Sequence, residues 1–448
     1  MMNFESRIGP DFGDNAPVYP DNAVPEWYRD AKLGFFIHWG LYSVPAWAVE
    51  HGERFIPTED AYAWHQYAEW YGNTVRITGS PTWERHQALY GPGVSYEDLA
   101  DKWDAGAFDA EAFVGELLGA GAKYIIPVTK HHEGFCLWDT NTTGFNSVAR
   151  GPKRDLIGEL HDATRRADAR FGVYFSGALD WHVSDFPPIE SDTDLFRYRR
   201  NDSAFSRYSA DQVDELIERF SPDVLWNDID WPDGGKGHEE YGVASLLGRY
   251  FDRVPGGVVN DRWGVPYSGY LTREYTNVAD IQQRPWESTR GLGFSFGYNQ
   301  DESAKHSLSG TELVRHLVDV VSKNGNLLIN VGPTAAGEIP ELQLKAMREM
   351  GAWLSANGEG IYGTRPWIRA EEPVGVPRRY TTSAGAVHVL VMEPAAGEVE
   401  LPVELAGRPA RWADGSAVDT VPSSDGTSRV AIPEQLRAEP VARLTVSV

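Results

Sequence analysis

Short hydrophobic runs alternate with amphipathic segments over most of the chain. The runs cover residues 32–40, 123–130, 170–177, 223–228, 257–262 and 326–333. Runs of this length that are apolar on both faces are typical of strands in a parallel sheet, because helices cover both sides of such a sheet. The segments between them, residues 109–118, 155–169, 209–220, 239–251 and 309–323, predict the covering helices.

Two of the predicted helices begin with a capping signal. Ser209-Ala210-Asp211 and Ser309-Gly310-Thr311-Glu312 each place a hydroxyl before a first turn that contains an acid. Repeated strand–helix units favour an α/β fold with a (β/α)8-like TIM barrel over an open doubly wound sheet. No glycine-rich phosphate-binding motif follows the first predicted strand, which argues against a nucleotide site.

The hydrophobic pattern changes after a predicted helix at residues 340–357 and a turn-rich segment at residues 358–366. Residues 386–392, 398–403, 428–432 and 442–448 alternate between apolar and polar positions and are separated by Gly, Pro and Asp. This pattern predicts a small antiparallel β-sandwich. We therefore expect a barrel domain at residues 1–362 and a C-terminal β-sandwich domain at residues 363–448, with no distinct binding site on the sandwich.

Composition narrows the classes of partner. The 448 residues include 41 Lys and Arg against 65 Asp and Glu, a net charge of -24. This charge argues against nucleic acid or an anionic membrane as the partner and favours a neutral or cationic substrate. Cys136 is the sole cysteine, which excludes an intramolecular disulfide, and we expect it to pack in the core.

No targeting or membrane segment is evident in the sequence. Residues 1–7 lack the apolar core of a signal peptide, and no later stretch approaches the ~20 apolar residues of a membrane span. We expect a cytoplasmic protein. The sequence leaves the oligomeric state open, a homo-oligomer included.

Polar and aromatic residues gather where the predicted strands end, which is where a barrel carries its functional groups. Glu69 and Trp70 lie in the long insertion after the first strand, and Glu274 lies in the predicted loop beyond residue 262. Neutral donors, acceptors and aromatic rings with few charges are typical of a carbohydrate pocket. The residues at or just after the strand ends are His38, Trp39, His131, His132, Tyr174, Trp226, Asp228 and Arg262.

The segment at residues 224–232 places Asp228 between Trp226 and Trp231. Indole faces cover the apolar side of a pyranose while a carboxylate meets the anomeric carbon, so the segment predicts a sugar-cleaving site. Asp230 is a weaker alternative, since residues two apart share a face if the strand continues. Any one of these residues alone fits an ordinary role in the core or at a helix cap, and their common position at strand ends favours a site.

The pair His131-His132 suggests a metal site, because imidazole is a common ligand. Successive residues of an extended chain point in opposite directions, and no HxH or HExxH spacing accompanies the pair. We therefore expect no metal and no cofactor. Two alternatives stay open, a metal-dependent hydrolase that uses the histidines and a sugar-binding barrel without catalysis.

Five segments, in order along the chain, resemble the α-L-fucosidases of glycoside hydrolase family 29. They are residues 34–45 (GFFIHWGLYSVP), 130–138 (KHHEGFCLW), 225–228 (LWND), 260–264 (NDRWG) and 324–333 (NGNLLINVGP). The resemblance extends from about Trp27 through the predicted sandwich, and the combination of segments is specific although no single one is. It implies a retaining exo-glycosidase that releases terminal α-L-fucose from fucosylated oligosaccharides or glycoconjugates.

The resemblance also implies roles for individual residues. Asp228 matches the family's nucleophile, and Glu274 is the predicted general acid/base, at the spacing seen in bacterial enzymes of the simpler, aryl-fucoside-tolerant subgroup. Glu287, in Pro285-Trp286-Glu287, is the alternative acid/base. The residues implied to hold the fucose hydroxyls or organise the carboxylates are His38, Glu69, Trp70, His131, His132 and Arg262, and those implied to form an apolar wall beside the C5 methyl group are Phe36, Tyr174, Trp226 and Phe296.

Overall fold

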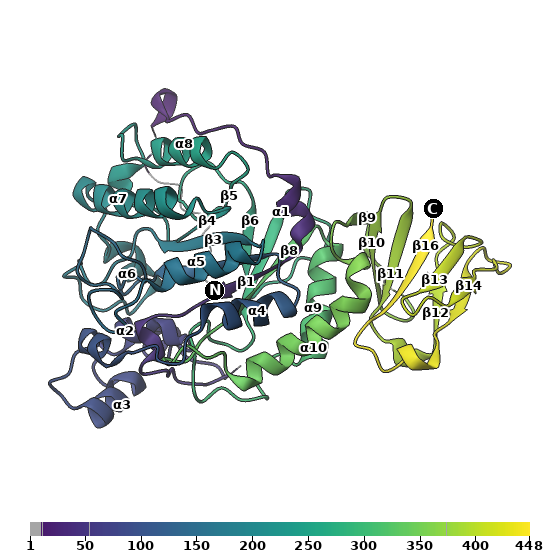
Figure 1. Cartoon of the computed structure of the whole chain (residues 1–448), viewed down its shortest axis with the longest axis horizontal. Helices are drawn as coiled ribbons and strands as arrows, with labels where there is room; N and C mark the ends of the chain where they lie inside the picture. Colours follow the sequence, from purple (N-terminus) through teal and green to yellow (C-terminus); the bar gives the residue numbers. More distant parts are fainter. Residues whose placement is uncertain (1–9, 11, 53, 373) are drawn as a thin grey trace.

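A parallel sheet rolled into a barrel forms the larger part of the molecule, and a β-sandwich follows it (Figure 1). The computed structural model describes residue 10 and residues 12–52, 54–372 and 374–448. The prediction made for residues 1–7 lies outside the described residues.

Eight strands form the barrel sheet: β1 (Leu33–Ile37), β2 (Tyr124–Lys130), β3 (Arg170–Ser176), β4 (Val224–Asp228), β5 (Val258–Val259), β6 (Leu271–Glu274), β7 (Trp286–Gly291) and β8 (Gly325–Val331). Their order is β5-β4-β3-β2-β1-β8-β7-β6, and hydrogen-bonded neighbours run parallel. Because β1 lies between β2 and β8, the sheet curls round instead of staying open. The backbone N–H groups of Gly269 and Tyr270 both donate to the Val259 carbonyl, at 3.1 and 3.3 Å, and join the two ends.

Six longer helices cover the barrel: α4 (Ala110–Gly119), α5 (Leu156–Arg166), α7 (Ser203–Phe220), α8 (Val243–Arg253), α9 (Gly310–Ser322) and α10 (Glu341–Asn357). They confirm the predicted helices, with ends that differ by a few residues. The capping box at Ser309 and Glu312 is also confirmed. No helix in the described part of the chain is long and apolar enough to cross a membrane.

The predicted start of α7 is wrong. The helix begins at Ser203, and its N-cap is Asp202, whose side chain accepts a hydrogen bond from Phe205 N at 3.0 Å. Ser209 lies inside the helix, where its hydroxyl donates to the Gly177 carbonyl at 3.4 Å. A serine followed by an acid resembles a cap in sequence, but here an earlier aspartate satisfies the first turn.

Two barrel strands were missed. β6 and β7 lie between residues 271 and 291, where we predicted no strand, and residues 260–285, all of them described, contain no helix. Thr272, Glu287 and Thr289 are buried polar residues on these strands. The apolar run that predicts a buried strand is therefore absent. β5 is likewise shorter than predicted, because the Asn260 side chain, and not its backbone, pairs with Asn227 of β4.

Three of the remaining helices are short, α1 (Glu26–Ala31), α2 (Tyr71–Thr74) and α6 (Asp192–Arg197), and α3 (Pro81–Tyr90) has ten residues. Helices α2 and α3 belong to the long insertion between β1 and β2, and neither was predicted. Cys136 is fully buried in the barrel core, as predicted.

The sandwich contains β9 (Arg365–Glu371), β10 (Arg378–Ser383), β11 (Ala386–Val391), β12 (Glu398–Leu401), β13 (Pro409–Trp412), β14 (Ala417–Asp419), β15 (Ser428–Ala431) and β16 (Ala442–Ser447). A six-stranded sheet, β14-β13-β16-β11-β10-β9, accompanies the β12-β15 pair, and all pairs are antiparallel. The four predicted strands are confirmed, and β9, β10, β13 and β14 were missed.

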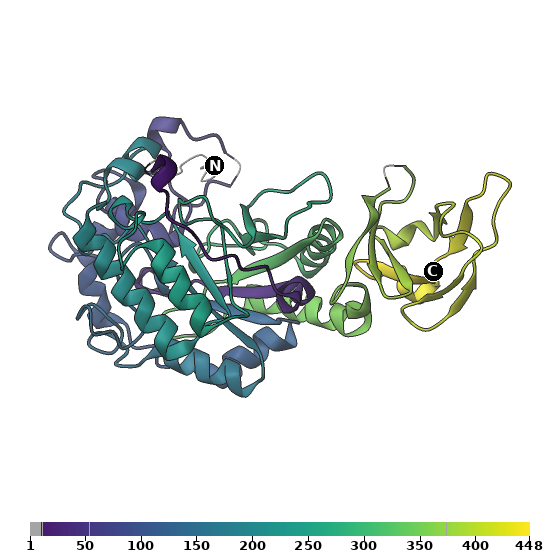
Figure 2. The ribbon, with the colours of Figure 1, turned by 90° about the horizontal axis from the view of Figure 1, so that it is seen from above.

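Helices α9 and α10 lie between the barrel strands and the sandwich (Figures 1 and 2). Trp353 of α10 donates its indole N–H to the Val441 carbonyl at 2.8 Å, and Arg379 of β10 pairs with Asp319 of α9 at 2.8 Å. The sandwich thus packs on the outside of the barrel, on the helices that flank β8.

Candidate active site

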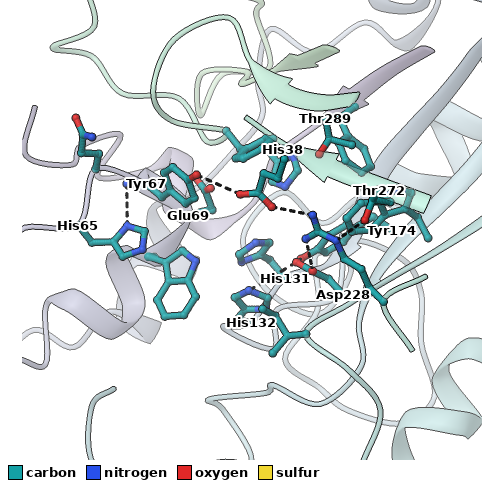
Figure 3. A pocket seen from close by; sticks show the side chains of 18 of the residues that line it. His38, His65, Tyr67, Glu69, His131, His132, Tyr174, Asp228, Thr272 and Thr289 are labelled. Carbon is teal, nitrogen blue, oxygen red and sulfur yellow. Dashed lines mark hydrogen bonds and ion pairs between the residues drawn. The ribbon is translucent and has the colours of Figure 1, made fainter. Parts of the chain in front are cut away.

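A pocket of about 560 Å³ opens at the carboxyl ends of the barrel strands (Figure 3). Residues that the sequence places far apart meet here because parallel strands end at one rim of the barrel. The pocket is lined by every predicted site residue except Glu287, namely Phe36, His38, Glu69, Trp70, His131, His132, Tyr174, Trp226, Asp228, Arg262, Glu274 and Phe296.

Two carboxylates face one guanidinium group in this pocket. Arg262 donates from one terminal nitrogen to Asp228 Oδ1 and from the other to Glu274 Oε2, both at 2.9 Å. Its Nε donates to Thr272 Oγ1 at 3.0 Å. The planar fork of arginine therefore fixes the two acids relative to each other.

Asp228 is the last residue of β4 and is held ionised. Tyr174 donates its hydroxyl to Asp228 Oδ2 at 2.8 Å. Burial by itself would raise the pKa of Asp228, but the charge of Arg262, the nearby His132 and the hydrogen bonds from Arg262 and Tyr174 outweigh it and lower the pKa. A carboxylate that is largely buried, stays charged and still lines the open pocket is suited to attack an electrophilic carbon.

Glu274 is the last residue of β6 and not a loop residue as predicted. Its second oxygen, Oε1, accepts a hydrogen bond from the Tyr67 hydroxyl at 3.1 Å. Its side chain is 25% exposed against 11% for Asp228, so it reaches further toward the mouth of the pocket. That is the side on which a leaving group would depart.

Glu287 does not reach the pocket. It is the second residue of β7 and lies fully buried in the barrel interior. Its carboxyl group accepts hydrogen bonds from Tyr28 at 2.9 Å, Tyr124 at 2.7 Å and the Trp226 indole at 3.1 Å. Glu287 therefore supports Trp226 from below, and the geometry favours Glu274 as the acid that meets a ligand.

Asp230, the weaker candidate for the nucleophile, does not line the pocket either. The chain leaves the strand after Asp228, and both Ile229 and Asp230 have positive φ values of 54° and 74°. The Asp230 carboxylate pairs with Arg199 at 3.0 Å and Lys236 at 2.7 Å. These ion pairs assign it to the packing of the loop after β4.

The expectation that His131 and His132 point in opposite directions is wrong. Strand β2 ends at Lys130 and the chain turns at once, with Gly134 N donating to the His131 carbonyl at 3.1 Å. The two rings consequently lie 4.0 Å apart and both line the pocket. In the described ranges, no three His, Cys, Asp or Glu side chains are grouped so that they could hold a metal ion.

The three predicted histidines of the pocket, His38, His131 and His132, are neutral at neutral pH. Burial lowers the pKa of His38 to about 3 and of His132 to about 4, and that of His131 falls well below its usual range for the same reason. His38 Nδ1 lies 2.6 Å from Asn330 Oδ1, and His132 Nδ1 lies 2.7 Å from Ser176 Oγ. The rings are thus fixed as neutral hydrogen-bonding groups.

Glu69 and Trp70 enter from the insertion after β1, in the 3-10 helix η5 (Ala68–Trp70). Glu69 Oε2 accepts from Gly297 N at 2.7 Å and from Ser295 Oγ at 3.4 Å. Burial raises the pKa of Glu69 to about 8 despite these hydrogen bonds. Trp70 packs edge-on against His132, with ring centroids 5.4 Å apart.

Aromatic rings form the apolar wall. Phe36 packs edge-on against Trp226 at 4.9 Å, and Tyr174 stacks on Trp226 at 5.4 Å. Phe296 lies 4.9 Å from His38 on another side. Arg262 sits over the Trp226 ring at 4.7 Å, which links this wall to the two carboxylates.

Several lining residues were missed by the sequence analysis: His65, Tyr67, Asp261, Thr272 and Thr289. Thr272 lies two positions before Glu274, so recognition of β6 as a strand would have placed both on one face. Tyr67 lies two positions before Glu69, but the irregular insertion offers no periodicity that could identify it.

Two curated relatives and a family model that match this chain carry the name alpha-L-fucosidase. A sequence model described as alpha-L-fucosidase matches residues 12–359. The chain is 32% identical to human tissue alpha-L-fucosidase over 86% of this chain and 78% of that protein, and 34% identical to rat plasma alpha-L-fucosidase over 80% and 75%.

Solved structures agree. A Thermotoga maritima alpha-fucosidase in complex with fucose is 41% identical, with a TM-score of 0.86 over 95% of this chain and 97% of that one. A Thermotoga maritima alpha-L-fucosynthase in complex with a fucosyl-fucosyl azide is also 41% identical, with a TM-score of 0.89 over 96% of this chain and 100% of that one.

Proposed function

The chain belongs to the alpha-L-fucosidase family and is a glycoside hydrolase that cleaves α-L-fucosides, and we propose that Asp228 and Glu274 perform this cleavage as nucleophile and general acid/base. One observation carries the proposal. Arg262 holds both carboxyl groups by the two terminal nitrogens of a single guanidinium, in the pocket at the carboxyl ends of the barrel strands.

The reaction proceeds in two displacements. Asp228 attacks the anomeric carbon of the fucosyl unit while Glu274, acting as the general acid, gives a proton to the departing glycosidic oxygen. The C1–O bond to the leaving group breaks as the bond to Asp228 Oδ forms. Glu274, now a carboxylate, then takes a proton from water, whose oxygen attacks C1 and releases Asp228, so fucose leaves with retained configuration.

The remaining pocket groups recognise the sugar. Neutral histidines, Glu69 and Trp70 supply hydrogen-bonding groups for the hydroxyls, and the wall formed by Phe36, Tyr174, Trp226 and Phe296 receives the C5 methyl group. A snug apolar contact with one methyl gains only ~1–3 kcal/mol, but an added hydroxyl at this position would be buried without a partner. L-galactose in place of L-fucose should therefore be accepted poorly.

We propose fucosylated oligosaccharides or glycoconjugates as the natural substrates, with the fucose terminal. The Thermotoga maritima relative was solved with fucose itself, and the pocket volume of about 560 Å³ accommodates one pyranose with room for part of a neighbour. A sugar-binding barrel without catalysis is less well supported, because such a protein has no need of two acids on one arginine.

Hydrolysis of an aryl α-L-fucoside by three variants tests the roles. Asp228→Gly should lose about 10³-fold or more in kcat, and added azide should restore turnover with inverted product. Added azide should restore turnover of Glu274→Ala, because azide is already an anion and needs no base to attack the fucosyl-enzyme. The product should be fucosyl azide with retained configuration.

Glu287→Gln is the matched control in this experiment. The substitution removes a glutamate carboxyl group that lies outside the pocket and keeps the length of the side chain, so azide should not stimulate this variant. The assignment is wrong if Asp228→Gly keeps wild-type turnover, or if azide rescues the Glu287 variant and not the Glu274 variant. Product configuration is read by NMR.

A further inference from the structure

Glu133 follows the two pocket histidines in the chain and is buried against one of them. Its side chain is 2% exposed, and Oε2 lies 3.7 Å from His131 Nδ1. Neither atom has a hydrogen-bond partner among the described residues. Buried polar atoms rarely stay unpaired, and catalytic hydrogen bonds that are long in a ligand-free site tighten when ligand binds. We therefore expect Glu133 Oε2 and His131 Nδ1 to form a hydrogen bond with each other.

Two other histidines of the pocket, His38 and His132, have fixed tautomers. Asn330 Nδ2 donates to the Phe296 carbonyl at 2.6 Å, so Asn330 Oδ1 is the acceptor for His38 Nδ1–H. Ser176 likewise gives its proton to the Leu179 carbonyl at 2.8 Å. Its oxygen must then accept from His132 Nδ1–H, and both rings present an unprotonated Nε2.

Three polar side chains of the pocket can only accept hydrogen bonds from a ligand, namely Asp228, His38 and His132. A sugar hydroxyl both donates and accepts, so the pocket needs donors aimed at hydroxyl oxygens. His131 supplies one if its proton is on Nε2.

The state of Glu133 decides between the tautomers of His131. Burial raises the pKa of Glu133 to about 8; the Asp180 and Glu69 charges act in the same direction, whereas Lys130 opposes them. At neutral pH its carboxyl group is therefore protonated and can donate, while the neutral His131 ring can accept at Nδ1.

We propose that Glu133 is a positioning residue that donates a hydrogen bond to His131 Nδ1 and thereby fixes the Nε2–H tautomer, which donates to a hydroxyl oxygen of the substrate. The identity of that substrate as a fucoside rests on the proposed function. The tautomer itself does not, because it is set by two side chains of this protein.

Histidine NMR on the full-length protein measures the tautomer directly. Long-range proton–nitrogen correlation of ¹⁵N-histidine-labelled protein distinguishes Nδ1–H from Nε2–H, and His131→Gln identifies the signals by their loss. We expect Nε2–H at His131 in wild type and in Glu133→Gln, since the glutamine amide can also donate. In Glu133→Met, which cannot donate, this preference should be lost.

His38 and His132 serve as internal controls and should show Nδ1–H in each protein. The rival arrangement has an ionised Glu133 that accepts from His131 Nδ1–H. An Nδ1–H signal for His131 in wild type at neutral pH would overturn the proposal, whatever the enzyme's activity. Wild type and Glu133→Gln alone decide the question if Glu133→Met fails to fold.

Kinetics test whether the tautomer serves substrate recognition. For an aryl α-L-fucoside, kcat/KM of Glu133→Gln should stay within about threefold of wild type, and that of Glu133→Met should fall about tenfold to a hundredfold. Aryl 2-, 3- and 4-deoxyfucosides identify the hydroxyl that His131 contacts. The ratio of kcat/KM in wild type to kcat/KM in Glu133→Met should fall to about one for the deoxyfucoside that lacks this hydroxyl. The same ratio for all three deoxyfucosides would contradict the recognition role.

Discussion

Arg262 connects more of the pocket than any other single residue discussed above. Burial by itself would lower its pKa, but the charges of Asp228 and Glu274 and the hydrogen bonds to them raise it further above its usual range. The guanidinium is therefore a permanent cation between the two acids. One consequence is that Asp228 can stay ionised although it is buried, because its charge is compensated within hydrogen-bond distance.

The buried histidines predict a loss of stability in acid. His132 has a folded pKa of about 4, below its usual value of 6.5. The unfolded chain gains a proton on this ring below pH ~6.5 while the folded protein does not, so stability is full above that pH and falls toward the folded pKa. The loss from His132 should be about 1 kcal/mol between pH ~6 and pH ~5.

Urea unfolding at these two pH values checks this prediction. His132→Gln should make the loss of unfolding free energy smaller by about 1 kcal/mol. His238→Gln, at an exposed position, is the control and should leave the pH dependence as in wild type. An unchanged slope in His132→Gln would show that the ring is protonated in the folded protein.

At the scale of elements, the contacts between β5 and β6 position Glu274, the proposed acid/base. Asp261 Oδ1 accepts from Thr272 N at 3.0 Å and from Thr272 Oγ1 at 2.7 Å, next to the backbone bonds from residues 269 and 270. This side-chain pairing replaces a regular ladder between two short strands. It holds β6 at the depth where Glu274 meets Arg262.

The start of α7 gives a second prediction at this scale. Asp202→Ala should lower the unfolding free energy by about 1 kcal/mol, because it removes the cap that accepts from Phe205 N. Ser209→Ala should cost less than about 0.5 kcal/mol, since alanine favours the helix interior.

Chemical denaturation measures both changes, and Arg200→Ala is the control. Arg200 pairs with Asp202 at 3.0 Å on the surface, so its removal reports the contribution of the ion pair apart from the cap. An exposed pair contributes about 0–1 kcal/mol. A larger cost for Ser209→Ala than for Asp202→Ala would place the start of the helix where the sequence pattern suggested.

At the scale of the whole molecule, the sandwich supports the barrel without entering the site. No residue between 363 and 448 is among those that line the pocket, within the described part of the chain. It contacts α9 and α10, which follow β7 and β8 (Figure 2), and Arg365 of β9 forms ion pairs with Glu26 and Asp30 of α1. The site and the sandwich are thus on separate sides of the barrel sheet.

We predict that weakening this interface affects stability and not catalysis. Trp353→Phe removes the indole N–H and leaves the Val441 carbonyl buried without its partner. The unfolding free energy should fall by about 1–3 kcal/mol. The values of kcat and KM for an aryl α-L-fucoside, measured well below the unfolding temperature, should remain those of wild type. A change in KM would instead indicate that the sandwich is coupled to the pocket.

The sequence by itself predicted the barrel with a following sandwich and the six apolar barrel strands, and twelve of the thirteen predicted site residues line the pocket. These features could be predicted because they follow from local pattern. An apolar run predicts a covered strand, and the residues at the ends of such strands meet by the geometry of a parallel barrel. The family segments then supplied roles for residues that the pattern only located.

Only the tertiary structure decided the features that have no local sequence pattern. β6 and β7 were hidden because their buried residues are polar, and their discovery moved Glu274 onto a strand and Glu287 into the barrel interior. The turn after β2, which brings His131 and His132 together, could not be predicted from the expected strand. Hydrogen bonds between distant residues set protonation and tautomers, so the charge on Asp228 and the tautomers of His38 and His132 are properties of the folded chain alone.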